Sequence, residues 1–189
     1  MTAPAKKRAT YQDVLDAPPN MVAEVLLGEL HLSPRPARRH GKAASTLGME
    51  LGGAFERGRG GPGGWVIFDE PELHLGEDIL VPDLGGWRTE RFPLGADEEA
   101  YFVTPPDWVC EVLSPSTSRY DRTDKLTIYA RERIPYVWLV DPRERTLECY
   151  VLEGSAWKLV GSHRDSAVVR APPFEVFNLE LGALWLPEA

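Results

Sequence analysis

The sequence predicts an α+β fold, built as an α/β sandwich in which helices flank one mixed central sheet. A first helix is followed by a run of short strand-like segments separated by turns, which favours antiparallel pairing. A strand over 108–113, a helix over 120–133 and a strand over 136–140 then follow in quick order, which predicts a right-handed crossover unit. The 189 residues, 43% of them hydrophobic, suffice for a single domain over 1–189.

Local signals predict the elements of the first third of the chain. A capping-box pattern at Thr10 and Asp13 starts a short helix that a proline pair stops. A hairpin turns at Gly28, an amphipathic helix weakened by glycines follows, and a glycine-rich stretch forms a flexible turn. These elements span 11–17, 22–33, 38–57 and 58–64.

Apolar runs and turn residues predict the rest. A polar, proline-punctuated stretch over 88–100 is typical of a surface loop. The helix over 120–133 must end near Ile134 because Pro135 follows. The tail over 174–186 is apolar and partly helical or strand-like. Strands are expected at 65–68, 73–75, 79–84, 108–113, 136–140, 146–152 and 157–160.

Composition narrows the class of protein. No apolar run could span a bilayer, and the basic segment 1–8 has no apolar stretch behind it that would make a signal peptide. Cys110 and Cys149 each lie in an apolar run, which predicts reduced, buried thiols. We therefore expect a cytoplasmic protein with no membrane partner.

The formal net charge of -8 argues against a surface that is basic throughout and binds polyanions nonspecifically. Any contact with nucleic acid must be local. Cations gather at the start of the second predicted helix, where the nucleic-acid-binding candidates are Arg35, Arg38, Arg39 and Lys42. The alternative is that these residues form a solvated helix entrance.

Two carboxylates lie in strand-like, apolar segments. An unpaired carboxylate buried there would cost on the order of several kcal/mol of desolvation, so Glu111 and Asp83 each need a cation. One divalent metal ion shared by both acids would meet both needs. Alternation along 108–113 gives Glu111 apolar neighbours, and Pro82 predicts that Asp83 lies where strand pairing breaks.

Lys125 is a candidate cation on the helix that follows Glu111. Asp121 and Lys125 are four residues apart and share a helix face, so their simplest interpretation is a surface ion pair. The functional alternative is that Lys125 leans back toward Glu111. The set of Asp83, Glu111 and Lys125 is then either a functional site or a structural ion cluster.

Together these residues form a longer pattern that resembles the Uma2 family of restriction-endonuclease-like proteins, within the PD-(D/E)XK nuclease superfamily. The resemblance covers most of the chain, and its specific part is the central block with the acid and lysine that follow. The matching residues are Pro82-Asp83, Glu-Val-Leu-Ser-Pro-Ser-Thr at 111–117, Asp121, Lys125, Tyr129 and the run 136–141.

The resemblance implies a restriction-endonuclease-like core and an endonuclease that needs Mg2+ or Mn2+. Asp83 and Glu111 would hold the metal ion, Lys125 would complete the catalytic set, and nucleic acid, with DNA expected, would be the substrate. Carboxylate oxygens suit Mg2+, which lowers the pKa of a bound water that then attacks phosphorus. The lysine could orient that water, stabilise the transition state, or act as a base if its pKa is depressed. Glu24 and Asp121 are additional candidates. Glu24 either approaches the metal ion from the other side or is an exposed carboxylate on its strand.

One departure from the superfamily pattern keeps a second hypothesis open. The plain pattern places a lysine two residues after the second acid, where this chain has Leu113. Together with the acidic net charge, this departure supports the alternative of a catalytically inactive nuclease-fold binding or assembly module. We expect a homodimer, since two sites could then act on two strands.

Other polar residues have simpler interpretations. The four histidines show no spacing typical of zinc sites. Asp141 precedes Pro142 and is expected to start a turn, and Ser114 and Ser116 are expected to cap a helix rather than act as nucleophiles.

Overall fold

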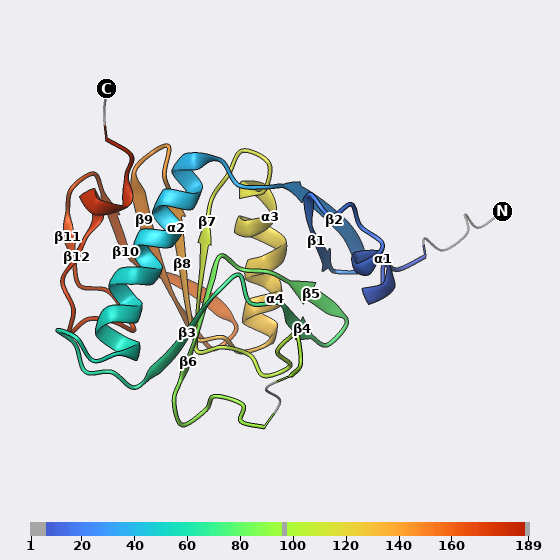
Figure 1. Ribbon diagram of the computed structural model, residues 1–189, viewed down its shortest axis with the longest axis horizontal. Coiled ribbons are helices and arrows are strands. Elements are labelled where there is room, and N and C mark those ends of the chain that lie inside the picture. The colour runs from blue at the N-terminus through green and yellow to red at the C-terminus, as the bar shows by residue number, and fades with distance from the viewer. Residues whose placement is uncertain (1–6, 96–97, 188–189) are drawn as a thin grey trace.

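The computed structural model describes residues 7–95 and 98–187. Residues 1–6 of the predicted basic N-terminal segment and residues 96 and 97 of the predicted 88–100 loop lie outside the described residues. Helices lie on both sides of a mixed sheet, which confirms the predicted α+β fold (Figure 1). No helix in the described part of the chain is long and apolar enough to cross a membrane.

The main sheet has six strands, and its middle contains the predicted crossover. The neighbours β7 and β8 run parallel, and every other neighbouring pair in this sheet is antiparallel. In spatial order the strands are β10 (Ala156–Arg164), β9 (Thr146–Glu153), β8 (Tyr136–Asp141), β7 (Trp108–Val112), β6 (Leu84–Arg88) and β3 (Trp65–Asp69).

A second, four-stranded sheet contains the predicted hairpin. Leu27 and Gly28 turn the hairpin with φ values of 54° and 86°, as a tight two-residue turn of this hand requires. The order is β2 (Glu29–Pro34), β1 (Met21–Leu26), β5 (Asp78–Leu80) and β4 (Leu73–Leu75), all antiparallel. A two-stranded sheet of β11 (Val168–Val169) and β12 (Leu179–Glu180) precedes the 3-10 turn η3 (Leu181–Leu184).

The helices begin and end close to the predicted positions. α1 (Tyr11–Leu15) starts at the capping box, where the backbone N–H of Thr10 donates to Asp13 Oδ2 at 2.8 Å. The long helix is α2 (Arg38–Leu51), extended by a π-helical turn, η1 (Gly52–Glu56). The predicted helix over 120–133 consists of α3 (Ser118–Tyr120), a π-helical turn η2 (Asp121–Lys125) and α4 (Leu126–Arg131).

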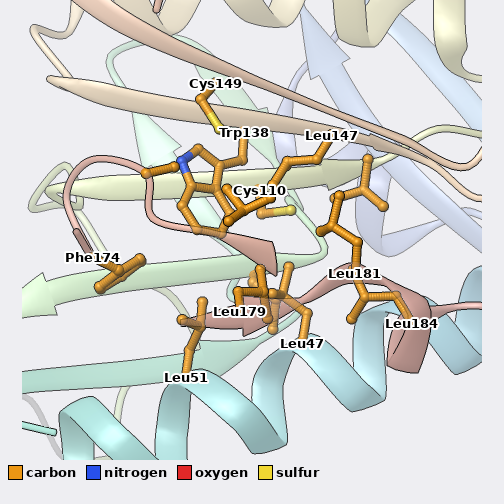
Figure 2. Close-up of a cluster of buried hydrophobic side chains, with 14 of the residues drawn as sticks. Leu47, Leu51, Cys110, Trp138, Leu147, Cys149, Phe174, Leu179, Leu181 and Leu184 are labelled. Atoms are coloured by element: carbon orange, nitrogen blue, oxygen red, sulfur yellow. The ribbon is translucent and has the colours of Figure 1, made fainter. Parts of the chain in front are cut away.

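The core has two clusters of buried side chains, one on each face of the six-stranded sheet. Trp108, Cys110 and Val112 of β7 point into the first cluster, where Leu47 and Leu51 of α2 cover them (Figure 2). The second cluster holds Val109 of β7 and Leu113 directly after it, together with Ile128 and Tyr129 of α4. The alternation predicted along β7 is therefore confirmed.

One strand prediction was wrong. The run 79–84 is not a single strand, because β5 ends at Leu80 and β6 begins at Leu84. Pro82 cannot donate a ladder hydrogen bond, so pairing breaks there and Asp83 lies in the link, as expected. β6 also takes Arg88, the first residue of the predicted 88–100 loop.

Two smaller predictions are confirmed, and one was wrong. The thiols of Cys110 and Cys149 are free and buried, and burial raises the pKa of both. Asp141 starts a turn, since its Oδ1 accepts the backbone N–H groups of Arg143 and Glu144 at 2.9 and 3.1 Å. The prediction that Ser114 and Ser116 cap the helix was wrong, because the residue before α3 is Thr117 and within the described ranges it makes no side-chain cap hydrogen bond; Ser114 Oγ instead accepts the backbone N–H of Thr117 at 3.3 Å within the preceding turn.

Candidate active site

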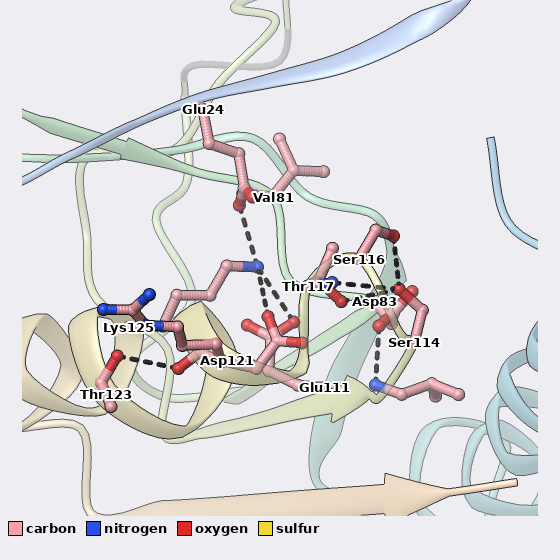
Figure 3. A network of polar contacts seen from close by, with 12 residues as sticks. Glu24, Val81, Asp83, Glu111, Ser114, Ser116, Thr117, Asp121, Thr123 and Lys125 are labelled. Atoms are coloured by element: carbon pink, nitrogen blue, oxygen red, sulfur yellow. Dashed lines mark hydrogen bonds and ion pairs between the residues drawn. The ribbon is translucent and has the colours of Figure 1, made fainter. Parts of the chain in front are cut away.

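Asp83 and Glu111 lie side by side where the two large sheets meet. Leu84 of β6 pairs with Cys110 of β7, so their neighbours Asp83 and Glu111 are also adjacent. The backbone N–H of Val112 donates to Asp83 Oδ2 at 2.7 Å (Figure 3). Both acids line one cavity of about 180 Å³. The two carboxylates predicted to act together therefore face the same space.

Lys125 comes from η2 and reaches this cavity. Its Nζ lies 2.9 Å from Glu24 Oε1, 3.1 Å from Glu111 Oε2 and 3.5 Å from Asp121 Oδ1 (Figure 3). The expected approach of Lys125 to Glu111 is present. The prediction of a surface ion pair with Asp121 was wrong, because the two side chains are only 4% and 2% exposed. Their ion pair is buried because η2 lies between the sheet and the hairpin.

Glu24 reaches the cluster from the second sheet. It lies on β1 of the hairpin, and its Oε1 also accepts the backbone N–H of Val81 at 2.8 Å. Its side chain is 6% exposed, so the alternative of an exposed strand carboxylate was wrong. Glu24 thus joins the hairpin to the link that holds Asp83.

Two residues that contact the acids were not predicted as site residues, although Tyr129 belongs to the pattern that resembles the family. His40 Nε2 lies 2.5 Å from Asp83 Oδ1, and the hydroxyl of Tyr129 donates to Glu111 Oε1 at 2.5 Å. Tyr129 follows Lys125 by four residues and so shares its helix face, a signal that was available. His40 lies in the predicted basic cluster, but no local pattern connects it with an acid 43 residues away.

The site carries more negative than positive charge. Glu24, Glu111 and Asp121 surround the ammonium of Lys125, and Asp83 and exposed Glu70 line the same cavity. Burial raises the pKa of Glu111 well above its ordinary value; Asp121, Asp83 and Glu24 add to this, and Lys125 opposes it. Burial also raises the pKa of Asp121. The cluster would therefore gain from a further cation.

Lys125 stays protonated in this setting. Burial alone would lower its pKa, but Glu111, Glu24 and Asp121 together raise it well above the ordinary value of 10.5. Its expected role as a base required a depressed pKa, so the electrostatics oppose that role. The two roles that need a positive charge, orientation of a water and stabilisation of developing negative charge, are compatible with it.

The donor set fits a hard divalent cation in its chemistry. All the acidic ligand atoms are carboxylate oxygens, the type that Mg2+ and Mn2+ prefer, and buried Asp121 Oδ1 has no hydrogen-bond partner among the described residues. Within 7–95 and 98–187, no three His, Cys, Asp or Glu side chains are already grouped as metal ligands. The ammonium of Lys125 lies among three of the acids.

The predicted basic cluster borders the cavity in part. Arg35 lines the cavity and is exposed, whereas Arg38 and Arg39 are exposed in the first turn of α2 without lining it. Lys42 donates to Thr46 Oγ1 at 2.7 Å, along the helix. One of the four cations is therefore placed at the cavity, and two more lie next to its wall.

Comparisons with known proteins bear on the family and the fold of this chain. A family model, Uma2, described as a putative restriction endonuclease, matches residues 8–182. A crystal structure of a putative nuclease belonging to DUF820 from Anabaena variabilis ATCC 29413 superposes with a TM-score of 0.75. It is 23% identical in sequence, and the match covers 93% of this chain and 97% of that one. No curated protein is significantly similar in sequence to this chain.

Proposed function

Because this chain belongs to the Uma2 family, we propose that it is a metal-dependent endonuclease that hydrolyses phosphodiester bonds of nucleic acid, DNA above all. One observation carries the proposal. Acids from three separate parts of the chain, buried Glu24 and Glu111 and partly buried Asp83, converge on one cavity with a single protonated lysine. Such a charge excess is costly to a fold and is typical of a functional site.

Asp83 and Glu111 would hold the metal ion, since both face the cavity and both carry oxygen ligands. Mg2+ or Mn2+ bound there would supply a water of lowered pKa and would neutralise charge on the scissile phosphate. Asp121 and Glu24 would keep Lys125 in place through the contacts described above.

The chain's own cations would act on the phosphate. Lys125 carries a fixed positive charge at the cavity wall, where it would stabilise the negative charge that develops on phosphorus oxygens. Arg35 at the mouth, with Arg38 and Arg39 nearby, would position the flanking phosphates of the strand. Because the protein has a net negative charge, nucleic acid should bind only at this local group of cations and not over the rest of the surface.

Cleavage of a panel of single- and double-stranded DNA and RNA, with Mg2+ or Mn2+, tests the proposal. The variants Asp83→Asn and Glu111→Gln keep side-chain shape and should abolish cleavage. Asp124→Asn is the matched control, since Asp124 lies on η2 but does not line the cavity. Equal cleavage by wild type and both site variants would refute the proposal. Thermal unfolding of each variant shows that it is folded.

The second candidate function is a binding or assembly module that keeps the nuclease fold without catalysis. It is favoured by Leu113, which stands where the superfamily has a lysine, and by the internal pairing of Lys125 with three acids. Calorimetry separates the two candidates. The nuclease must bind Mg2+ at millimolar concentration with nucleic acid present, and no detectable heat of metal binding would favour the module.

We also propose a homodimer, since two cavities could then act on two strands of a duplex. Sedimentation at micromolar protein concentration tests this. A monomer at all concentrations, with and without DNA, would contradict it.

A further inference from the structure

His40 occupies a fixed position beside one of the proposed metal ligands. It lies in the first turn of α2, three residues before Ala43 and seven before Leu47, both fully buried against the sheet. These spacings place all three side chains on one face of the helix. His40 and Asp83 are 12% and 15% exposed, and both line the cavity. Core packing of α2 therefore sets where the imidazole lies.

Both oxygens of Asp83 have partners on the protein. Oδ2 accepts the backbone N–H of Val112, and Oδ1 lies 2.5 Å from His40 Nε2. The strand thus fixes one side of the carboxylate and the helix fixes the other. Each carboxylate oxygen has two lone pairs, so one on each oxygen stays free for a further ligand.

The second ring nitrogen indicates which tautomer His40 adopts. His40 Nδ1 is buried and has no hydrogen-bond partner among the described residues. A buried N–H without an acceptor is costly, and a bare lone pair is tolerated more readily. The proton is therefore assigned to Nε2, which donates it to Asp83. Donation from Nε2 orients the carboxylate of Asp83.

We propose that His40 is a positioning residue, which holds the Asp83 carboxylate in the orientation that binds the metal ion. The inference rests on the proposed function, since it gives that function's metal site a supporting residue. Groups that orient a metal ligand through a hydrogen bond commonly change metal affinity when they are removed.

Mn2+ affinity measured by calorimetry tests the proposal. His40→Ala should weaken binding by about 10- to 100-fold. His40→Gln, which offers an amide N–H donor of similar reach, should recover most of the loss. His163→Ala, on β10 and outside the cavity, is the matched control and should bind like wild type. Equal affinity of wild type and His40→Ala, or no recovery in His40→Gln, would overturn the proposal and leave the nuclease standing.

The hydrogen bond itself is tested without metal. Nitrogen-15 NMR of the histidine rings should show the Nε2–H tautomer for His40, assigned by the resonances that His40→Gln lacks. Asp83→Asn should perturb that ring and leave the ring of His163 unchanged. An Nδ1–H tautomer, or no response to Asp83→Asn, would overturn the proposal whatever the metal result. Absence of Mn2+ binding by wild type would overturn both this proposal and the nuclease.

Discussion

At the residue scale, the side chains proposed to carry out the chemistry are also those whose burial costs the fold free energy. Asp121 is buried next to Lys125, yet burial and the other acids keep its pKa raised, so its ionised form is held against a free-energy cost. Sites of this kind exchange stability for activity. The cost should be measurable one residue at a time.

Asp121→Asn should increase the free energy of unfolding by on the order of 1 kcal/mol at neutral pH in metal-free buffer. The substitution removes a negative charge from the cluster, and Lys125 keeps Glu24 and Glu111 as partners. Urea unfolding measures the change, and Asp124→Asn should stay within about 0.5 kcal/mol of wild type. If Asp121→Asn were less stable than wild type, the excess negative charge would not be what destabilises the fold.

The same residue predicts a pH dependence. A carboxyl with a raised folded pKa binds protons that the unfolded chain has already released, so its contribution to stability falls as pH rises from the ordinary value of 3.8 through the raised one. The stability gained in Asp121→Asn should therefore be small in acid and grow toward neutral pH. Urea unfolding at several pH values checks this, and a difference that does not vary with pH would contradict it.

Lys125→Met should lower the free energy of unfolding by about 3–5 kcal/mol, because it leaves several buried carboxylates without their cation. Lys158→Met is the control: the ion pair of Lys158 with Glu153 is exposed, so this variant should change stability by less than about 1 kcal/mol. Urea unfolding compares the two. Similar small losses in both variants would mean that Lys125 is not needed to balance the acids.

The candidate residues could be found from sequence only where burial and charge conflict locally. Glu111 and Asp83 interrupt apolar runs, and that conflict predicts a partner for each. His40 could not be found because its helix carries no signal for the acid that it contacts. The burial of Glu24 likewise depends on how the hairpin lies against η2, which no pattern within the hairpin records.

At the element scale, β6 shows why a strand can be missed when structure is predicted from sequence. Gly85 and Gly86 weaken its strand signal, since glycine is depleted in strands. In the fold, a Cβ on Gly86 would lie 3.1 Å from the ring of Trp108, and one on Gly85 would lie 2.8 Å from Pro71. Glycine is needed because the backbone passes close to these rings, a contact that only the tertiary structure creates.

The helix after β7 shows a second limit. Apolar spacing and a following proline predict its extent, but not that its middle is π-helical. Such a widened turn is common at functional sites, and here it contains both Asp121 and Lys125. The prediction of a helix was correct. Its π-helical turn could not be predicted, because the prediction assumed the regular spacing of an α-helix.

The glycine-rich turn after α2 gives an element-scale prediction. A Cβ on Gly61 would lie 2.6 Å from the backbone oxygen of Ala54 in η1, so Gly61→Ala should destabilise by about 1–3 kcal/mol. Gly53→Ala is the control, because nothing lies within 4 Å of its added Cβ. Thermal unfolding compares them. Equal stability of the two variants would mean that the backbone at Gly61 can shift away from Ala54 without cost.

At the scale of the whole molecule, metal binding and folding should be linked. A ligand at 100 times its Kd that binds only the folded chain adds about 2.7 kcal/mol, which corresponds to roughly 5–10 °C in Tm for a chain of this size. Wild type should show this shift with Mg2+ or Mn2+ and not with K+ at equal ionic strength. Asp83→Asn should show none, and a shift of equal size in that variant would place the ion elsewhere.

The hairpin contacts the rest of the molecule through polar and apolar groups of β1 and its turn. β1 pairs with β5 through Val25 and Ile79, and Glu24 reaches across to Val81 and Lys125. Loosening these contacts would withdraw one acid from the cluster and Leu26 of β1 from the second hydrophobic cluster, while the first hydrophobic cluster persists. Mild heating would then inactivate the protein before the six-stranded sheet unfolds, and activity would return on cooling. Loss of activity would in that case mean that the hairpin has detached, not that the whole chain has unfolded.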